Sequence, residues 1–142
     1  MIKQIFVNLP VKDLEKTKEF WGKLGFTFNA QFSDQKAASL VLGENIYAML
    51  ITEPYYKTFI KKEIADSSKV SEVINAVSVE TKERVDKLYD QAIEAGALSY
   101  KDADDYGWMY SRAFQDLDGH LWEILYTDLS KVPANPAESV KK

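Results

Sequence analysis

The chain has 142 residues, of which 46% are hydrophobic and 28% charged, and its formal net charge is −4. This composition is typical of an ordinary globular protein with a real core, built as one domain or as two small equivalent halves. The acidic balance and the lack of a basic stripe argue against a nucleic-acid-binding surface. The sequence has no cysteine and one histidine, which excludes disulfides, thiolate metal sites and clusters of histidine ligands.

The sequence also argues against membrane insertion. No apolar run reaches the ~18–20 residues that a membrane-spanning helix needs, and no signal peptide opens the chain. We therefore expect a cytoplasmic protein.

The first half predicts a strand, a helix and three further strands. The predicted strands cover residues 2–11, 26–32, 37–42 and 46–52. The helix follows Asp13, a good N-cap, and ends at Gly25. Pro54 indicates the start of a short helix, and the polar stretch 65–71 is the expected boundary between the halves.

The second half repeats this order. Strands are predicted over 72–79, 97–100, 107–115 and 121–126, with an acidic loop at 102–105. The helix covers 82–95, capped by Thr81 and ended by Gly96. Such a repeat indicates an internal duplication. We expect one domain over 1–127, with modules at about 1–62 and 70–127, and a tail at 128–142 that is a surface arm or disordered.

A carboxylate stands in the middle of the last apolar strand. Asp118-Gly119 predicts a tight turn, after which Glu123 shares a strand face with Leu121 and Leu125. A buried carboxylate is costly unless it is paired or binds a metal. Glu123 is therefore either a site residue or an exposed or salt-bridged glutamate. His120, in the turn, is expected at the surface.

Two segments together resemble the vicinal oxygen chelate superfamily. They are Val11-Lys-Asp-Leu with Leu24-Gly-Phe, and Asp116-Leu-Asp-Gly-His-Leu-Trp-Glu. This superfamily includes glyoxalase I, bleomycin- and fosfomycin-resistance proteins and extradiol dioxygenases. The opening Phe6-Val-Asn-Leu-Pro-Val is similar to its glyoxalase-like subgroup, the predicted lactoylglutathione lyases.

The resemblance covers roughly residues 1–127 and implies an α+β fold. Two βαβββ modules would form an incomplete mixed-sheet barrel around a pocket. The resemblance also implies a homodimer, in which the modules pair within one chain or are swapped between two. Family enzymes hold a divalent metal with His, Gln or Glu from the first and last strands of each module.

The resemblance places these metal-ligand positions at Phe6, Ala48, Ile74 and Glu123, with Met49 replacing Ala48 if the alignment shifts by one residue. Only Glu123 has a side chain suited to a divalent ion, so we expect no complete metal site and no other cofactor. A metal held through Glu123 remains the alternative. As a carboxylate in an apolar pocket, Glu123 is also the candidate catalytic base.

Without catalysis, Glu123 would be the remnant of a metal site, hydrogen-bonded to Asn8 or Ser111 or paired with Arg112. The predicted ligand-binding residues are Phe6, Asn8, Ala48, Ile74 and Ser111.

The expected function is binding of a small, partly apolar molecule in the cup without a complete divalent metal site. One alternative is a metal-dependent lyase or isomerase of glyoxalase type that uses Glu123. The other is a non-catalytic regulatory or interaction module. The sequence leaves open whether any reaction is catalysed.

Overall fold

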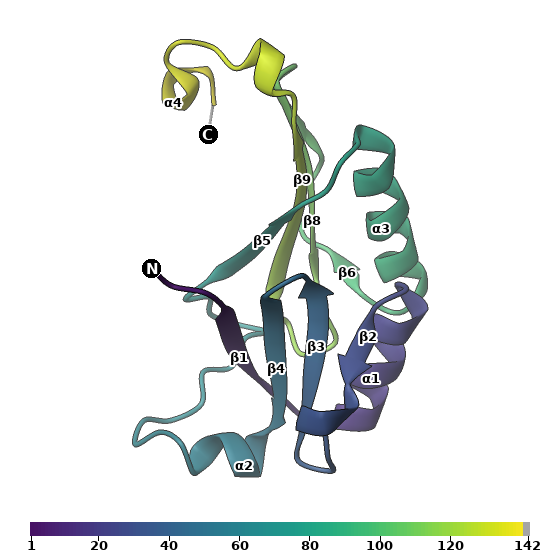
Figure 1. Cartoon of the computed structure of the whole chain (residues 1–142), viewed down its shortest axis with the longest axis vertical. Helices are drawn as coiled ribbons and strands as arrows, with labels where there is room; N and C mark the ends of the chain where they lie inside the picture. The colour runs from purple at the N-terminus through teal and green to yellow at the C-terminus, as the bar shows by residue number, and fades with distance from the viewer. Residues whose placement is uncertain (141–142) are drawn as a thin grey trace. The chain divides into compact units, whose positions relative to one another are not determined.

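The computed structural model describes residues 1–140 and divides into two compact units, Met1–Asp66 and the remainder from Ser67 onward. Each unit contains one βαβββ module with its own mixed sheet, to which unit two adds one short extra strand (Figure 1). The fold is α+β, as predicted, and neither sheet closes into a barrel. The duplication of strand and helix order is therefore present in three dimensions.

Module one contains β1 (Ile5–Val11), α1 (Leu14–Lys23), β2 (Thr27–Asn29), β3 (Ala37–Gly43) and β4 (Ile46–Thr52), followed by the short α2 (Glu53–Lys57). Its sheet has the order β1-β4-β3-β2, in which β1 and β4 are parallel and the other pairs antiparallel.

The ends of α1 follow the predicted signals. The Asp13 side chain accepts a hydrogen bond from the backbone nitrogen of Lys16 at 3.1 Å, and Gly25 ends the helix with a φ of 91°. The buried side chains of α1 are Leu14, Thr17, Phe20 and Trp21. This helix packs on the sheet through β3 and β4, and so covers one face of the module-one sheet.

The strand predicted over 26–32 is shorter than expected. It ends at Asn29, whose side-chain oxygen accepts a hydrogen bond from the backbone nitrogen of Gln31 at 3.1 Å. This bond bends the chain into the 3₁₀ turn η1 (Ala30–Phe32), because a local side-chain acceptor competes with strand pairing.

Module two contains β5 (Ile74–Ser78), α3 (Lys82–Glu94), β6 (Leu98–Ser99), β7 (Asp104–Asp105), β8 (Met109–Gln115) and β9 (Leu121–Thr127). Its sheet has the order β5-β9-β8-β6, with β7 paired to β8. Helix α3 packs on β8 and β9, on the right of the sheet in Figure 1. The predicted acidic loop is wrong in part, since Asp104 and Asp105 form the short strand β7.

The C-terminal segment is an arm of module two. It contains the 3₁₀ turn η2 (Leu129–Lys131) and the short helix α4 (Pro136–Ser139). The indole Nε1 of Trp108 donates to the Ser139 hydroxyl at 2.9 Å and attaches the arm. The last two residues of the predicted tail, 141 and 142, lie outside the described residues. Within residues 1–140, no helix combines the length and the apolar character that crossing a bilayer requires.

Candidate functional site

A cavity of about 640 Å³ lies on the face of the module-one sheet opposite α1. Its floor consists of strand side chains from β1, β3 and β4, namely Asn8, Ala37, Met49 and Ile51. Its walls come from η1 and the turn after it, and from α2 and the residues that follow. The main wall residues are Phe32, Asp34, Tyr55, Tyr56, Phe59 and Ile60. Apolar and aromatic side chains with a few polar groups are the usual lining of a small-molecule site.

Strand register decides which residues reach this face. In the parallel pairing of β1 with β4, Asn8 lies opposite Met49 and Phe6 opposite Tyr47. The Phe6 and Tyr47 rings stack with centroids 5.1 Å apart and an interplanar angle of 10°. Phe6 and Asn8 therefore share the cavity face, as the alternation predicts, with Asn8 in the lining and Phe6 stacked beside it.

The predicted ligand position Ala48 does not reach this face. Ala48 is fully buried at 0% exposure on the side of the sheet that α1 covers. Comparing the strand pairing of the two modules identifies the equivalent residue. In module one, Met49 pairs with Asn8, two positions after Phe6. In module two, Glu123 pairs with Ala76, two positions after Ile74. By strand register, Met49 is thus the counterpart of Glu123, which favours the one-residue shift in the alignment.

The polar groups of the cavity are few and differ in how firmly they are held. Asp34 accepts hydrogen bonds from the backbone nitrogens of Lys36 and Ala37 at 2.7 and 3.1 Å, so its carboxylate is fixed. The Asn8 amide donates to the carbonyl oxygen of Phe6 at 3.5 Å, the long limit of a hydrogen bond. A ligand could therefore replace this bond of Asn8 at little cost.

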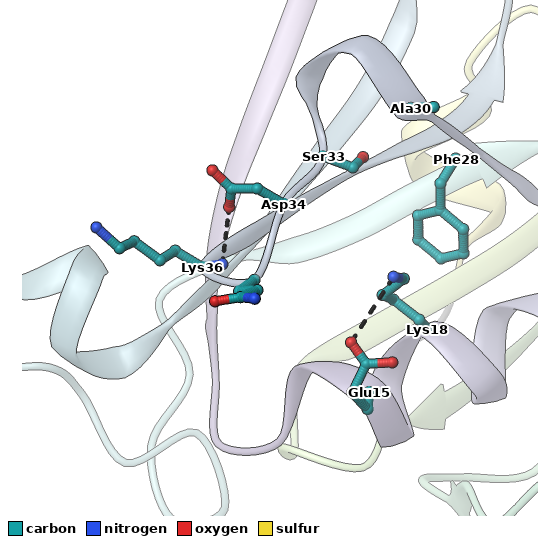
Figure 2. Close-up of a pocket in the computed structure, with 8 residues that line it drawn as sticks. Glu15, Lys18, Phe28, Ala30, Ser33, Asp34 and Lys36 are labelled. Carbon is teal, nitrogen blue, oxygen red and sulfur yellow. Dashed lines mark hydrogen bonds and ion pairs between the residues drawn. The ribbon is translucent and has the colours of Figure 1, made fainter.

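A second hollow, of about 570 Å³, lies between α1 and the segment after η1 (Figure 2). Its charged groups are satisfied locally. Figure 2 shows Glu15 paired with Lys18, at 3.8 Å, and the Asp34 carboxylate bonded to the backbone nitrogen of Lys36, at 2.7 Å. This hollow offers fewer apolar contacts than the sheet cavity, which is therefore the better candidate for a ligand site.

In module two, Glu123 lies on the sheet face opposite α3. On β9 it is flanked by Ala76 of β5 and Ala113 of β8. Ile74 and Ser111 point to the same face by alternation, as predicted. Ile74 is 57% exposed, whereas Ser111 is 1% exposed. Small side chains thus surround the carboxylate on both sides.

Of the three alternative partners for Glu123, the pairing with Arg112 is wrong. Arg112 is one residue out of phase and points to the α3 side. There it pairs with Asp86 at 3.4 Å, and its guanidinium lies 3.7 Å from the centre of the Tyr89 ring. The negative charge of Glu123 acts instead on Lys101. Its pKa is raised first by the hydrogen bond to Asp104 and also by the negative charge of Glu123.

The turn before β9 is more buried than the sequence suggests. His120, expected at the surface, is only 8% exposed, and its Nδ1 lies 3.2 Å from the Ser67 hydroxyl. The Asp116 carboxylate accepts hydrogen bonds from the backbone nitrogens of Asp118 and His120 and from Nε1 of Trp122, at 2.9, 3.0 and 3.0 Å. Burial raises the pKa of Asp116. This network holds the start of β9 and so positions Glu123.

The side chains at the implied metal-ligand positions do not fit a divalent ion. Phe6 and Ile74 have no donor atom, and the thioether of Met49 is a soft ligand that suits Cu(I) rather than a hard divalent ion. Among residues 1–140, no group of three or more His, Cys, Asp or Glu side chains gathers in a way that could hold a metal. Glu123 is the one position of the four with a suitable donor.

Residues 3–124 match the family model described as Glyoxalase/Bleomycin resistance protein/Dioxygenase superfamily. The chain belongs to this superfamily. The family model spans both βαβββ modules and ends just after Glu123. No curated protein matches the chain.

Solved structures of several other proteins share the fold. A hypothetical protein from S. aureus, SA1046, is 30% identical with a TM-score of 0.76, covering 89% of this chain and 94% of its own. A glyoxalase/bleomycin resistance protein/dioxygenase family enzyme from Burkholderia phytofirmans is 20% identical, with a TM-score of 0.71 and coverages of 86% and 96%. The fosfomycin resistance protein FosX from Listeria monocytogenes is 21% identical, with a TM-score of 0.66 and coverages of 92% and 98%. At these last two identities, the likeness concerns the fold alone.

Proposed function

We propose that this superfamily member binds a small, partly apolar molecule in the module-one sheet cavity, without a complete divalent metal site. The observation that carries the proposal is the lining of the cavity. Aromatic and aliphatic side chains surround it, and Asn8 and Asp34 supply a small number of polar groups. The volume of about 640 Å³ falls within the range of ~300–1,000 Å³ typical of small-molecule sites.

Two exposed rings at the wall strengthen the case for an apolar ligand. Phe32 is 60% exposed and Phe59 is 62% exposed. A ligand that packs against them removes apolar surface from water, which stabilises the complex by about 25 cal/mol per Å². An aromatic ligand would also gain from stacked or edge-on ring contacts, as Tyr55 and Phe59 already make with each other at 4.9 Å between centroids.

The glyoxalase-type alternative has less support in the site. That chemistry needs a metal to polarise substrate oxygens and a base to move a proton. Three of the four implied ligand positions lack a suitable donor, and the negative charge of Glu123 acts on a cation of the chain itself, Lys101. The homodimer and the cytoplasmic location remain predictions.

The binding proposal can be tested with the fluorescent probe anilinonaphthalene sulfonate on the native protein. Phe59→Ala should weaken probe binding by roughly tenfold, since truncating a ring in a binding contact costs on the order of 1–2 kcal/mol. Because Phe59 is largely exposed, the variant should keep its fold. Tyr100→Ala is the matched control: this ring is 52% exposed but belongs to module two and is not among the residues that line the cavity. Equal effects of both variants, or no probe binding by the native protein, would contradict the proposal.

The proposed lack of a complete divalent metal site needs its own measurement. Elemental analysis of the purified protein should find no stoichiometric metal, and Ni²⁺, Zn²⁺, Mn²⁺ and Fe²⁺ should leave the thermal midpoint unchanged. Stoichiometric metal that disappears in Glu123→Ala would refute this part and make a glyoxalase-type lyase the leading function.

A further inference from the structure

The carboxylate of Glu123 has no hydrogen-bonding side chain directly beside it in the sheet. Its cross-strand neighbours are Ala76 and Ala113, whose side chains are single methyl groups. A half-buried carboxylate in such surroundings needs a positive charge from elsewhere to offset its desolvation.

A lysine in the connection between β6 and β7 lies on the same face of the module-two sheet. Lys101 follows β6, and its ammonium bonds to the Asp104 carboxylate at 2.6 Å. Asp104 of β7 pairs with Ser111 of β8, so the two side chains share a face of the sheet. The next residue of β8 on that face is Ala113, which lies opposite Glu123 of β9. The ion pair is partly shielded, with the Asp104 side chain 31% exposed. The strand pairing thus brings Lys101 and both carboxylates to one face of module two.

The electrostatics agree with this placement. The pKa of Lys101 is raised first by its hydrogen bond to Asp104 and then, through space, by the charges of Asp104 and Glu123. Two carboxylates therefore act on one ammonium. On the same sheet face, the Ser111 hydroxyl is buried and has no hydrogen-bond partner among the described residues.

We propose that Lys101 is a built-in cation of this face, which neutralises Glu123 together with Asp104 and so removes the attraction of the face for a divalent ion. This inference rests on the metal-free part of the proposed function. In it, Lys101 is a positioning residue that acts through the charge of Glu123. Without Lys101, two carboxylates and the Ser111 hydroxyl would share the face, a set of oxygen donors that suits Mn²⁺.

The first test is Mn²⁺ binding, followed by calorimetry and by the thermal midpoint. Lys101→Met should bind Mn²⁺ roughly tenfold more tightly than the native protein, because one unit of positive charge beside the ion is removed. Adding Glu123→Gln should abolish the gain. The matched control is Lys82→Met, which removes the ion pair with Asp105 at 2.9 Å, a partner that points to the α3 face. It should behave like the native protein.

Three results of this titration would overturn the inference. They are a Lys101→Met variant that binds no better than the native protein, an equal gain in Lys82→Met, and a gain that survives Glu123→Gln.

The second test is a double-mutant cycle between Lys101 and Glu123 in metal-free buffer. We expect a favourable coupling of up to about fivefold in the unfolding equilibrium constant, the size measured for partly exposed ion pairs. No coupling, in a native protein that carries no metal, would overturn this inference and leave the proposed function intact. Stoichiometric metal on the native protein would overturn both.

Discussion

The turn between β8 and β9 packs its glycine against the backbone of the segment that opens unit two. Gly119 has a φ of +89°, and a Cβ at this position would lie 2.8 Å from the carbonyl carbon and oxygen of Ser67 and from the nitrogen of Ser68. Real Cβ atoms essentially never come this close to other heavy atoms, and the obstacle is backbone rather than a flexible side chain. We therefore expect Gly119→Ala to displace this segment from the turn.

The cost of Gly119→Ala has two parts. A residue with a Cβ loses about 1–2 kcal/mol of stability when its backbone is held in the left-handed region. Relief of the steric overlap adds about 1–3 kcal/mol, as for other overpacked sites. Gly107 separates the two parts, because its φ is +81° and a Cβ there meets nothing within 4 Å. Gly107→Ala should therefore lose only the first part.

Urea unfolding of the native protein and both variants, followed by circular dichroism, measures these losses. Gly119→Ala should lose about 1–3 kcal/mol more than Gly107→Ala. It should also shift the amide NMR signals of Ser67 and Ser68, because the contact between the Ser67 hydroxyl and His120 would be broken. Equal losses in the two variants would refute the packing of this segment on the turn.

Two further predictions concern carboxylates of module two. Asp116→Ala removes the acceptor of three hydrogen bonds in a buried site and should lower the free energy of unfolding in urea by about 3–5 kcal/mol. Asp116→Asn should cost less, and equal costs in the two variants would contradict the role of this hydrogen-bond network. The pKa of Asp105 is lowered, first by the hydrogen bond from the backbone nitrogen of Gly107 and then by Lys82. Its stabilising contribution is therefore present above the unfolded pKa of about 3.9 and is lost as the pH falls through the lower folded value. The stability difference between the native protein and Asp105→Asn should shrink below about pH 4, and a constant difference would contradict this assignment.

The sequence predicted the repeated module and the limits of its helices because those features depend on local chemistry. Asp13 and Thr81 cap their helices through bonds to backbone nitrogens three residues later, at 3.1 Å in both cases. Gly25 and Gly96 end the helices with φ values of 91° and 114°. The alternation of side chains along single strands also placed Phe6 with Asn8, and Glu123 with Leu125, on common faces.

Predictions that depended on pairing between distant segments were less successful. Ala48 and Met49 differ by one residue, and this difference moves the side chain to the other face of β4. The pairing of β1 with β4 decides between them. The short strand β7 likewise forms because β8 offers it a partner, since two acidic residues have little tendency to form a strand alone.

By itself, the sequence determined the α+β class, the duplicated βαβββ order, the faces of individual strands and the scarcity of metal-binding side chains. Only the tertiary structure placed α2 and η1 around the module-one sheet cavity, buried His120, directed Arg112 to α3 and paired Lys101 with Asp104 on the sheet face of Glu123. The physical reason is the distance along the chain over which each kind of interaction acts. Caps, turns and strand alternation arise from interactions over a few residues, whereas a cavity or an electrostatic partner depends on register between segments far apart in the chain.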